Sequence, residues 1–143
     1  MGLFNIFKKK KHTLQQDITP ATEWVVTALN SSGYKADYTL ESMKEIDRFF
    51  DEQNKPGGIL TADNVGSKLF SLGCYVGETI LRLYGGEWVT NDRDPQGEIN
   101  IQIRLKDNSL LLPVRKMMKR YQLGAEESIY AYVILIGQKL ELQ

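Results

Sequence analysis

The spacing of apolar residues predicts one long central helix and, after it, a change from helix to strand. Between residues 63 and 84 apolar side chains recur at helical spacing and gather on one side. That side carries Leu69, Leu72, Val76, Ile80 and Leu83. From residue 98 to 105 apolar and polar residues alternate, which is typical of an antiparallel strand with one solvated face. Gly85 and Gly86 separate the two patterns.

Shorter segments on both sides of the central helix predict the remaining elements. Thr19 followed by Pro20 predicts a helix from residue 19 to about 30, and a second helix is expected from residue 39 to 52. Residues 87 to 90 and 110 to 112 predict two more strands, and residues 114 to 123 another helix. The fold class is therefore α+β, with helices packed on a small three-stranded antiparallel sheet.

The last predicted element starts near residue 125 and leaves two alternatives open. Residues 129 to 136 are apolar on every side, so this run is either a buried helix or a strand. Glu126 and Glu127 before it favour a helix, because acidic residues stabilise the positive end of the helix dipole.

Three glycines occupy another side of the central helix. Gly66, Gly73 and Gly77 each cost roughly 1 kcal/mol relative to alanine in a helix interior. Close approach of another backbone would compensate for this cost. We expect the central helix to be glycine-grooved and to receive the final helix in this groove, with Trp88 closing its end.

Composition limits the classes of function. The chain has 143 residues, of which 42% are hydrophobic and 25% charged, as in an ordinary globular protein. We expect a basic, flexible tail in residues 1–16 and a single α+β domain in residues 17–143. Eighteen basic residues balance eighteen acidic ones, which removes the electrostatic case for nucleic acid as a partner.

The sequence offers few groups for catalysis or metal binding. Cys74 is the only cysteine, which excludes an intrachain disulfide and fits a reducing compartment. Asp92 and Asp94 imitate the start of a calcium loop, but the twelfth position from Asp92 is Ile103 instead of the required glutamate. The only histidine, His12, lies in the basic tail, so no pair of nucleophile and base can be assembled. We expect no catalytic residue, no metal and no cofactor.

A narrow polar stripe runs along the central helix. Tyr75, Glu78 and Arg82 share it, and Glu78 and Arg82 are four residues apart, as in a stabilising surface ion pair. The functional alternative is a groove in which these three residues and Trp88 hold a small polar ligand.

The first residues of the chain also allow two interpretations. Four apolar residues, including Phe4 and Phe7, precede a run of four lysines, namely Lys8, Lys9, Lys10 and Lys11. The segment is either a solvated, disordered start, which we favour, or a weak anchor on an anionic membrane surface.

Three short motifs resemble those of a family of small uncharacterised bacterial proteins, a domain of unknown function. They are G-x-Y-x-G-E at residues 73–78, G-G-x-W at 85–88 and G-x-E-[DE]-S-[IL]-Y at 124–130. The resemblance covers about residues 38 to 137. It implies a bacterial, cytoplasmic protein with an α+β fold and no assigned activity. It also adds Glu127 and Tyr130 to the candidate binding residues Tyr75, Glu78 and Trp88.

These observations favour a non-enzymatic binding or protein-interaction module of the immunity or adaptor type. One alternative is a binder of a small polar ligand, or an enzyme, centred on Glu78. The other is a protein peripheral to the inner membrane face, anchored by its N-terminal apolar and basic segment.

Overall fold

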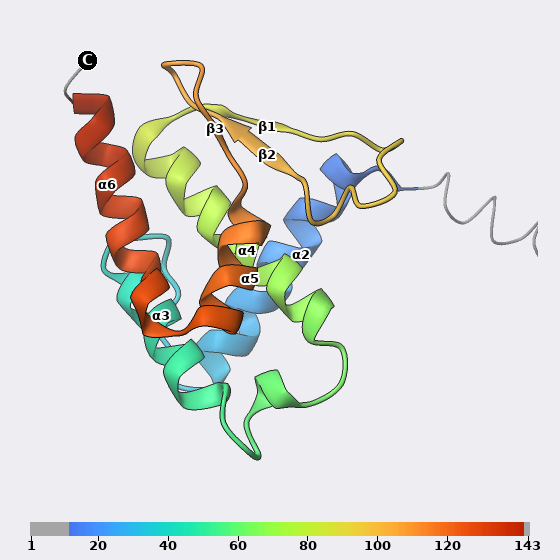
Figure 1. The fold of residues 1–143 in the computed structure, drawn as a ribbon, viewed down its shortest axis with the longest axis vertical. Helices are drawn as coiled ribbons and strands as arrows, with labels where there is room; N and C mark the ends of the chain where they lie inside the picture. Colours follow the sequence, from blue (N-terminus) through green and yellow to red (C-terminus); the bar gives the residue numbers. More distant parts are fainter. Residues whose placement is uncertain (1–11, 142–143) are drawn as a thin grey trace, which may run out of the picture.

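The computed structural model describes residues 12–141, which form an α+β fold (Figure 1). The sheet is three-stranded and antiparallel, with helices on its inner side and beside it. In chain order the elements are α2 (Leu14–Ser31), α3 (Ser42–Gln53), the short 3₁₀ helix η1 (Ile59–Thr61), α4 (Val65–Tyr84), β1 (Glu87–Val89), β2 (Gln102–Arg104), β3 (Leu110–Leu111), α5 (Pro113–Leu123), the 3₁₀ helix η2 (Ala125–Glu127) and α6 (Ile129–Glu141).

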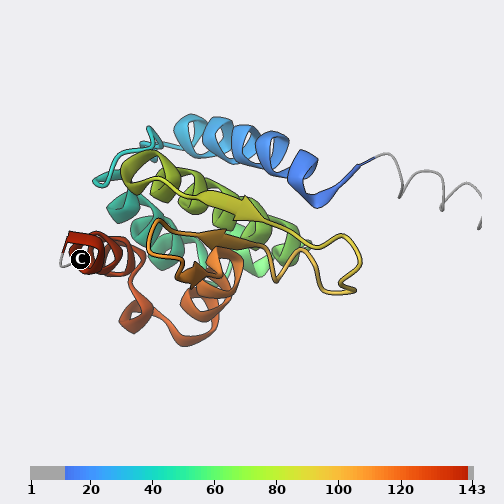
Figure 2. The same ribbon diagram turned by 90° about the horizontal axis from the view of Figure 1, so that it is seen from above.

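Helix α4 is the centre of the fold, as its apolar pattern predicts. Figure 2 shows α2 along one side of α4, and α5 and α6 on the other. Four of the five predicted core residues of α4 are buried, whereas Leu83 near its end is 39% exposed. Leu83 differs because it lines an open hollow between the end of α4, the β2–β3 turn and α6.

The sheet has the strand order β1-β2-β3. Ile103 of the central strand β2 pairs with Trp88 of β1 on one side and with Leu111 of β3 on the other. Strand β2 is shorter than the predicted run from 98 to 105. Ile99 and Asn100 instead form a turn in which both amides donate to the carbonyl of Gln96. The alternation still holds for Ile101, Ile103 and Leu105, which are buried.

The predicted start of the first helix is wrong. Helix α2 begins at Leu14, after a capping box in which Thr13 and Gln16 bond each other's backbone amides. Pro20 lies inside the helix, where it removes one backbone hydrogen bond. Residues 14 to 16, which the sequence assigns to the tail, are therefore helical. Leu14 and Ile18 explain why, because they pack in a hydrophobic cluster with Ile101.

The glycines of α4 do not receive the final helix. A Cβ atom built on Gly73 would lie 2.7 Å from Val114 Cγ2 at the start of α5. A Cβ on Gly77 would overlap the Trp88 ring, so Trp88 lies against this glycine as predicted. Gly66 has nothing within 4 Å of such an atom. The groove thus receives the start of α5 and the sheet.

The last element is a helix, as the acidic residues before it indicate. The expectation that a helix so apolar would be buried on every side is wrong, because α6 lies at the edge of the molecule in both views (Figures 1 and 2). Its buried residues are Ile129, Val133, Ile136 and Gly137. Leu135, on another side, is 56% exposed. Helix α6 therefore presents apolar surface that the fold leaves uncovered.

Two observations bear on membranes. Within residues 12–141, no helix combines the length and the apolar character that crossing a bilayer requires. The membrane-contact candidates Phe4, Phe7 and the lysines from residue 8 to 11 lie outside the described residues.

Candidate functional site

Tyr75 does not belong to an exposed polar stripe. Its side chain is fully buried, and its hydroxyl accepts a hydrogen bond from the Tyr38 amide at 3.0 Å. The same hydroxyl lies 2.7 Å from Ser42 Oγ. Burial raises the pKa of Tyr75, so this phenol stays protonated at neutral pH. Tyr75 thus joins α4 to the start of α3 and has no contact with solvent.

Glu78, Arg82 and Trp88 do meet at the surface. Trp88 Nε1 donates to Glu78 Oε1 over a long 3.4 Å, and Arg82 Nε lies 3.7 Å from Glu78 Oε2. The Arg82 guanidinium stacks on the ring of Tyr38, with 3.5 Å between its carbon and the ring centroid. Each polar group in this trio thus has a protein contact, as a structural ion pair requires.

The other two candidates lie on different elements. Glu127 in η2 accepts a hydrogen bond from Lys116 Nζ at 3.0 Å, which lowers the pKa of Glu127. The ring of Tyr130 in α6 lies under Lys44 Nζ, 4.7 Å from the ring centroid. The structure therefore does not bring the six sequence candidates together into one site.

A partly buried polar cluster that sequence reasoning missed surrounds Asp47 of α3. Its carboxylate accepts hydrogen bonds from Arg120 Nε at 3.0 Å, from Ser128 Oγ at 2.9 Å, and from the backbone amides of Ile129 and Tyr130 at 2.9 and 3.0 Å. Asp47 thus caps α6 from another helix, and every acceptor position is used within the protein. We assign this cluster to fold stability. It holds η2 and α6 in place.

An apolar hollow lies between β3 and α6. We call it the α6–β3 face, and its volume is about 670 Å³. Leu105, Leu110 and Leu111 line it from the sheet side, and Tyr132, Leu135 and Leu140 line it from α6. Lys139 lies at its rim. Strand β3 is an edge strand, so one row of its backbone groups points away from the sheet.

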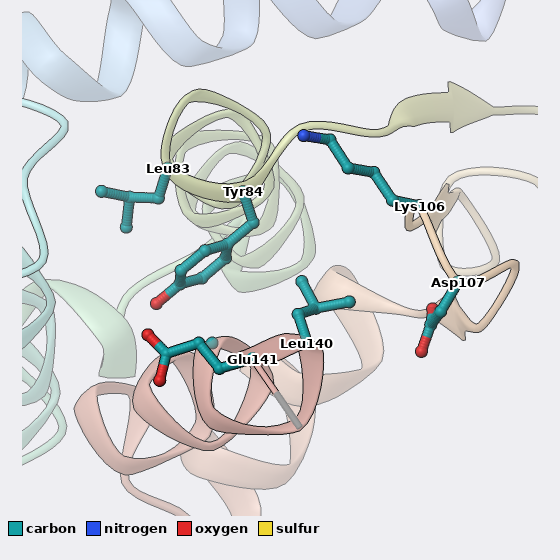
Figure 3. A pocket seen from close by; sticks show the side chains of 7 residues that line it. Leu83, Tyr84, Lys106, Asp107, Leu140 and Glu141 are labelled. Atoms are coloured by element: carbon teal, nitrogen blue, oxygen red, sulfur yellow. The ribbon is translucent and has the colours of Figure 1, made fainter. Parts of the chain in front are cut away.

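A second hollow of about 460 Å³ adjoins this face (Figure 3). Leu83 and Tyr84 come from the end of α4, Lys106 and Asp107 from the β2–β3 turn, and Leu140 and Glu141 from α6. The Tyr84 hydroxyl donates to the Val133 carbonyl at 3.1 Å and so joins α4 to α6. The amine of Lys106 points toward the end of α4, where helix carbonyls carry partial negative charge.

Groups for covalent or metal chemistry are sparse in the part of the chain that the structure describes. The Cys74 thiol is buried, and burial raises its pKa to about 12. At neutral pH it is protonated and therefore a poor nucleophile. No cluster of three or more histidine, cysteine, aspartate or glutamate residues suited to a metal occurs within residues 12–141.

Comparisons of the chain with protein-family models, curated proteins and solved structures found no match in any of the three. The resemblance to the bacterial family therefore stays a prediction. The functional conclusion has to come from the surface chemistry of this chain.

Proposed function

We propose that the protein is a non-enzymatic interaction module, of the immunity or adaptor type, in the bacterial cytoplasm, and that it binds a partner protein through the α6–β3 face. One observation supports the proposal: residues 129 to 136 of α6 are apolar on every side, yet the fold fully buries only one side of this run and leaves Leu135 56% exposed. A helix with that composition is ordinarily covered all round.

Exposed apolar side chains line the face and the hollow beside it. Of the six large hydrophobic residues exposed within residues 12–141, Leu110 and Leu135 line the α6–β3 face and Leu83 lines the adjoining hollow. Leu110 is 50% and Leu135 56% exposed, so about half of each side chain is available to a partner. Complete burial of one leucine contributes roughly 1.5–3 kcal/mol. Contiguous apolar surface of this kind marks interaction sites on globular proteins.

The shape of the face supports one kind of partner. An edge strand beside an apolar helix suits an extended segment that hydrogen-bonds to β3 and packs against α6. Alternate side chains of such a segment point to the same side, so we expect apolar residues at every second position. Lys139 at the rim favours an acidic residue next to them.

The experiment compares two exposed leucines. Leu135→Glu puts a charge into the face, whereas Leu123→Glu puts the same charge at the end of α5, where Leu123 is 63% exposed. Neither residue is part of the core, so both variants should fold, which circular dichroism checks. We expect the wild type and Leu123→Glu to co-purify one stoichiometric partner from the bacterial host and Leu135→Glu to lose it. Equal recovery by both variants would refute the assignment of the face.

A further inference from the structure

A second apolar groove lies on another side of the molecule, between the first turns of α4 and helix α5. Its volume is about 550 Å³. Leu69 and Phe70 line it from α4, and Val114, Met118 and Tyr121 from α5. Pro95, Gln96, Glu98 and Ile99, from the loop between β1 and β2, close its remaining side. We call it the α4–α5 groove.

The described chain begins beside this groove. The Leu14 amide donates to Asp92 Oδ1 at 2.8 Å. The Leu14 side chain lies against Gly97, such that a Cβ built on Gly97 would be 2.6 Å from Leu14 Cδ1. Gly97 is in the loop that forms the groove wall. Leu14 therefore lies at the rim of the α4–α5 groove, so the N-terminal segment is attached there.

We propose that the N-terminal segment of this chain docks in the α4–α5 groove through its apolar residues Leu3, Phe4, Ile6 and Phe7. Thr13 comes six positions after Phe7, and an extended chain of six residue steps spans up to roughly 20 Å. The segment is thus long enough to reach along the groove from its point of attachment.

Charge favours the same path. Lys8 to Lys11 lie between the apolar residues and Thr13 in the sequence, so in a docked segment they would pass the loop at residues 91–98. This loop carries Asp92, Asp94 and Glu98 against one basic residue, Arg93. Opposite charges attract each other within roughly 8–10 Å at physiological ionic strength. The lysine run of a docked segment would lie over the acidic loop while the aromatic rings enter the groove. A docked segment withholds Phe4 and Phe7 from a membrane.

Disulfide trapping tests the docking in the full-length chain. Asn5→Cys keeps all four apolar residues, and Ser67→Cys places its partner at the exposed rim of the groove. Asn5→Cys with Lys139→Cys, on the α6–β3 face, is the matched control. The native Cys74 does not interfere, because it is buried and protonated.

We expect the groove pair to form its disulfide in a glutathione buffer at least about tenfold faster than the control pair, because burial of one phenylalanine exceeds the free energy of a tenfold preference. Phe4→Ser and Phe7→Ser in the same background should remove this advantage. Equal rates for the two pairs, or an advantage that survives both serine substitutions, would overturn the proposal.

Anionic vesicles separate docking from membrane anchoring. With vesicles of phosphatidylglycerol and phosphatidylcholine present, a docked segment keeps its rate of disulfide formation and the protein stays in the supernatant. Sedimentation of the protein together with loss of the disulfide would show that the segment is a membrane anchor and would refute docking. Leu135→Glu should leave the trapping rate unchanged, because the two surfaces are separate.

Discussion

Removal of the Asp47 carboxylate tests how α6, which forms one side of the α6–β3 face, is held in the fold. Asp47→Ala deletes the acceptor for Arg120 and for the first amides of α6. The Arg120 side chain is only 4% exposed, so its charge cannot be hydrated in place. Removing one partner of a buried ion pair costs roughly 3–5 kcal/mol. Arg120 keeps its bond to Asp51 at 2.7 Å, so we expect a loss at the lower end, about 3 kcal/mol.

Urea unfolding followed by far-ultraviolet circular dichroism measures this free energy of unfolding. Asp51→Ala is the control, because Asp51 bonds the same guanidinium but its side chain is 58% exposed. An exposed ion pair contributes roughly 0–1 kcal/mol, so the control should lose far less stability. If Asp47→Ala cost less than about 1 kcal/mol, or no more than Asp51→Ala, the role assigned to Asp47 would be refuted.

Two further predictions concern α4. Gly77→Ala places a Cβ in the Trp88 ring, so despite the better helix propensity of alanine we expect a loss of about 1–3 kcal/mol in the free energy of unfolding. Gly66→Ala meets open space and should gain up to about 1 kcal/mol; a similar effect of both changes would contradict the packing described. Glu78→Gln keeps the acceptor for Trp88 and weakens only a long ion pair with Arg82, so urea unfolding should show a loss below about 1 kcal/mol; a larger loss would mean that Glu78 is a major structural residue.

Local patterns in the sequence predict much of the fold. The period of α4, the alternation at Ile101 and Ile103 and the glycine break after Tyr84 are each set by nearby residues, and the structure confirms the elements that they predict. The start of α2 was also readable, because Thr13 and Gln16 have the spacing of a capping box. The predicted helix start is residue 19 because of Pro20, since proline is more often found in the first turn of a helix than in its interior.

The features that the sequence does not predict depend on contacts between distant residues. Asp47 caps the start of α6 although it lies 82 positions before Ile129 in the sequence, and no pattern in the residues next to Asp47 indicates this role. The glycines of α4 correctly indicate close packing, but glycine alone does not specify whether α5 or α6 fills the space. A helical projection places Tyr75 on the polar side of α4. In the structure its hydroxyl is inside the core, where Ser42 and the Tyr38 amide satisfy its hydrogen bonds. The candidate face itself arises because α6 packs at the edge of the fold.

Photo-crosslinking in living cells tests the central claim most directly. A photoreactive amino acid at position 135 reports what contacts the α6–β3 face, and the same amino acid at position 123 reports a surface equally open to solvent. The account predicts one discrete crosslinked protein from position 135 and none from position 123, with the attachment point in an extended apolar segment of that protein. Identical crosslinking patterns at the two positions, or no product at position 135, would contradict it.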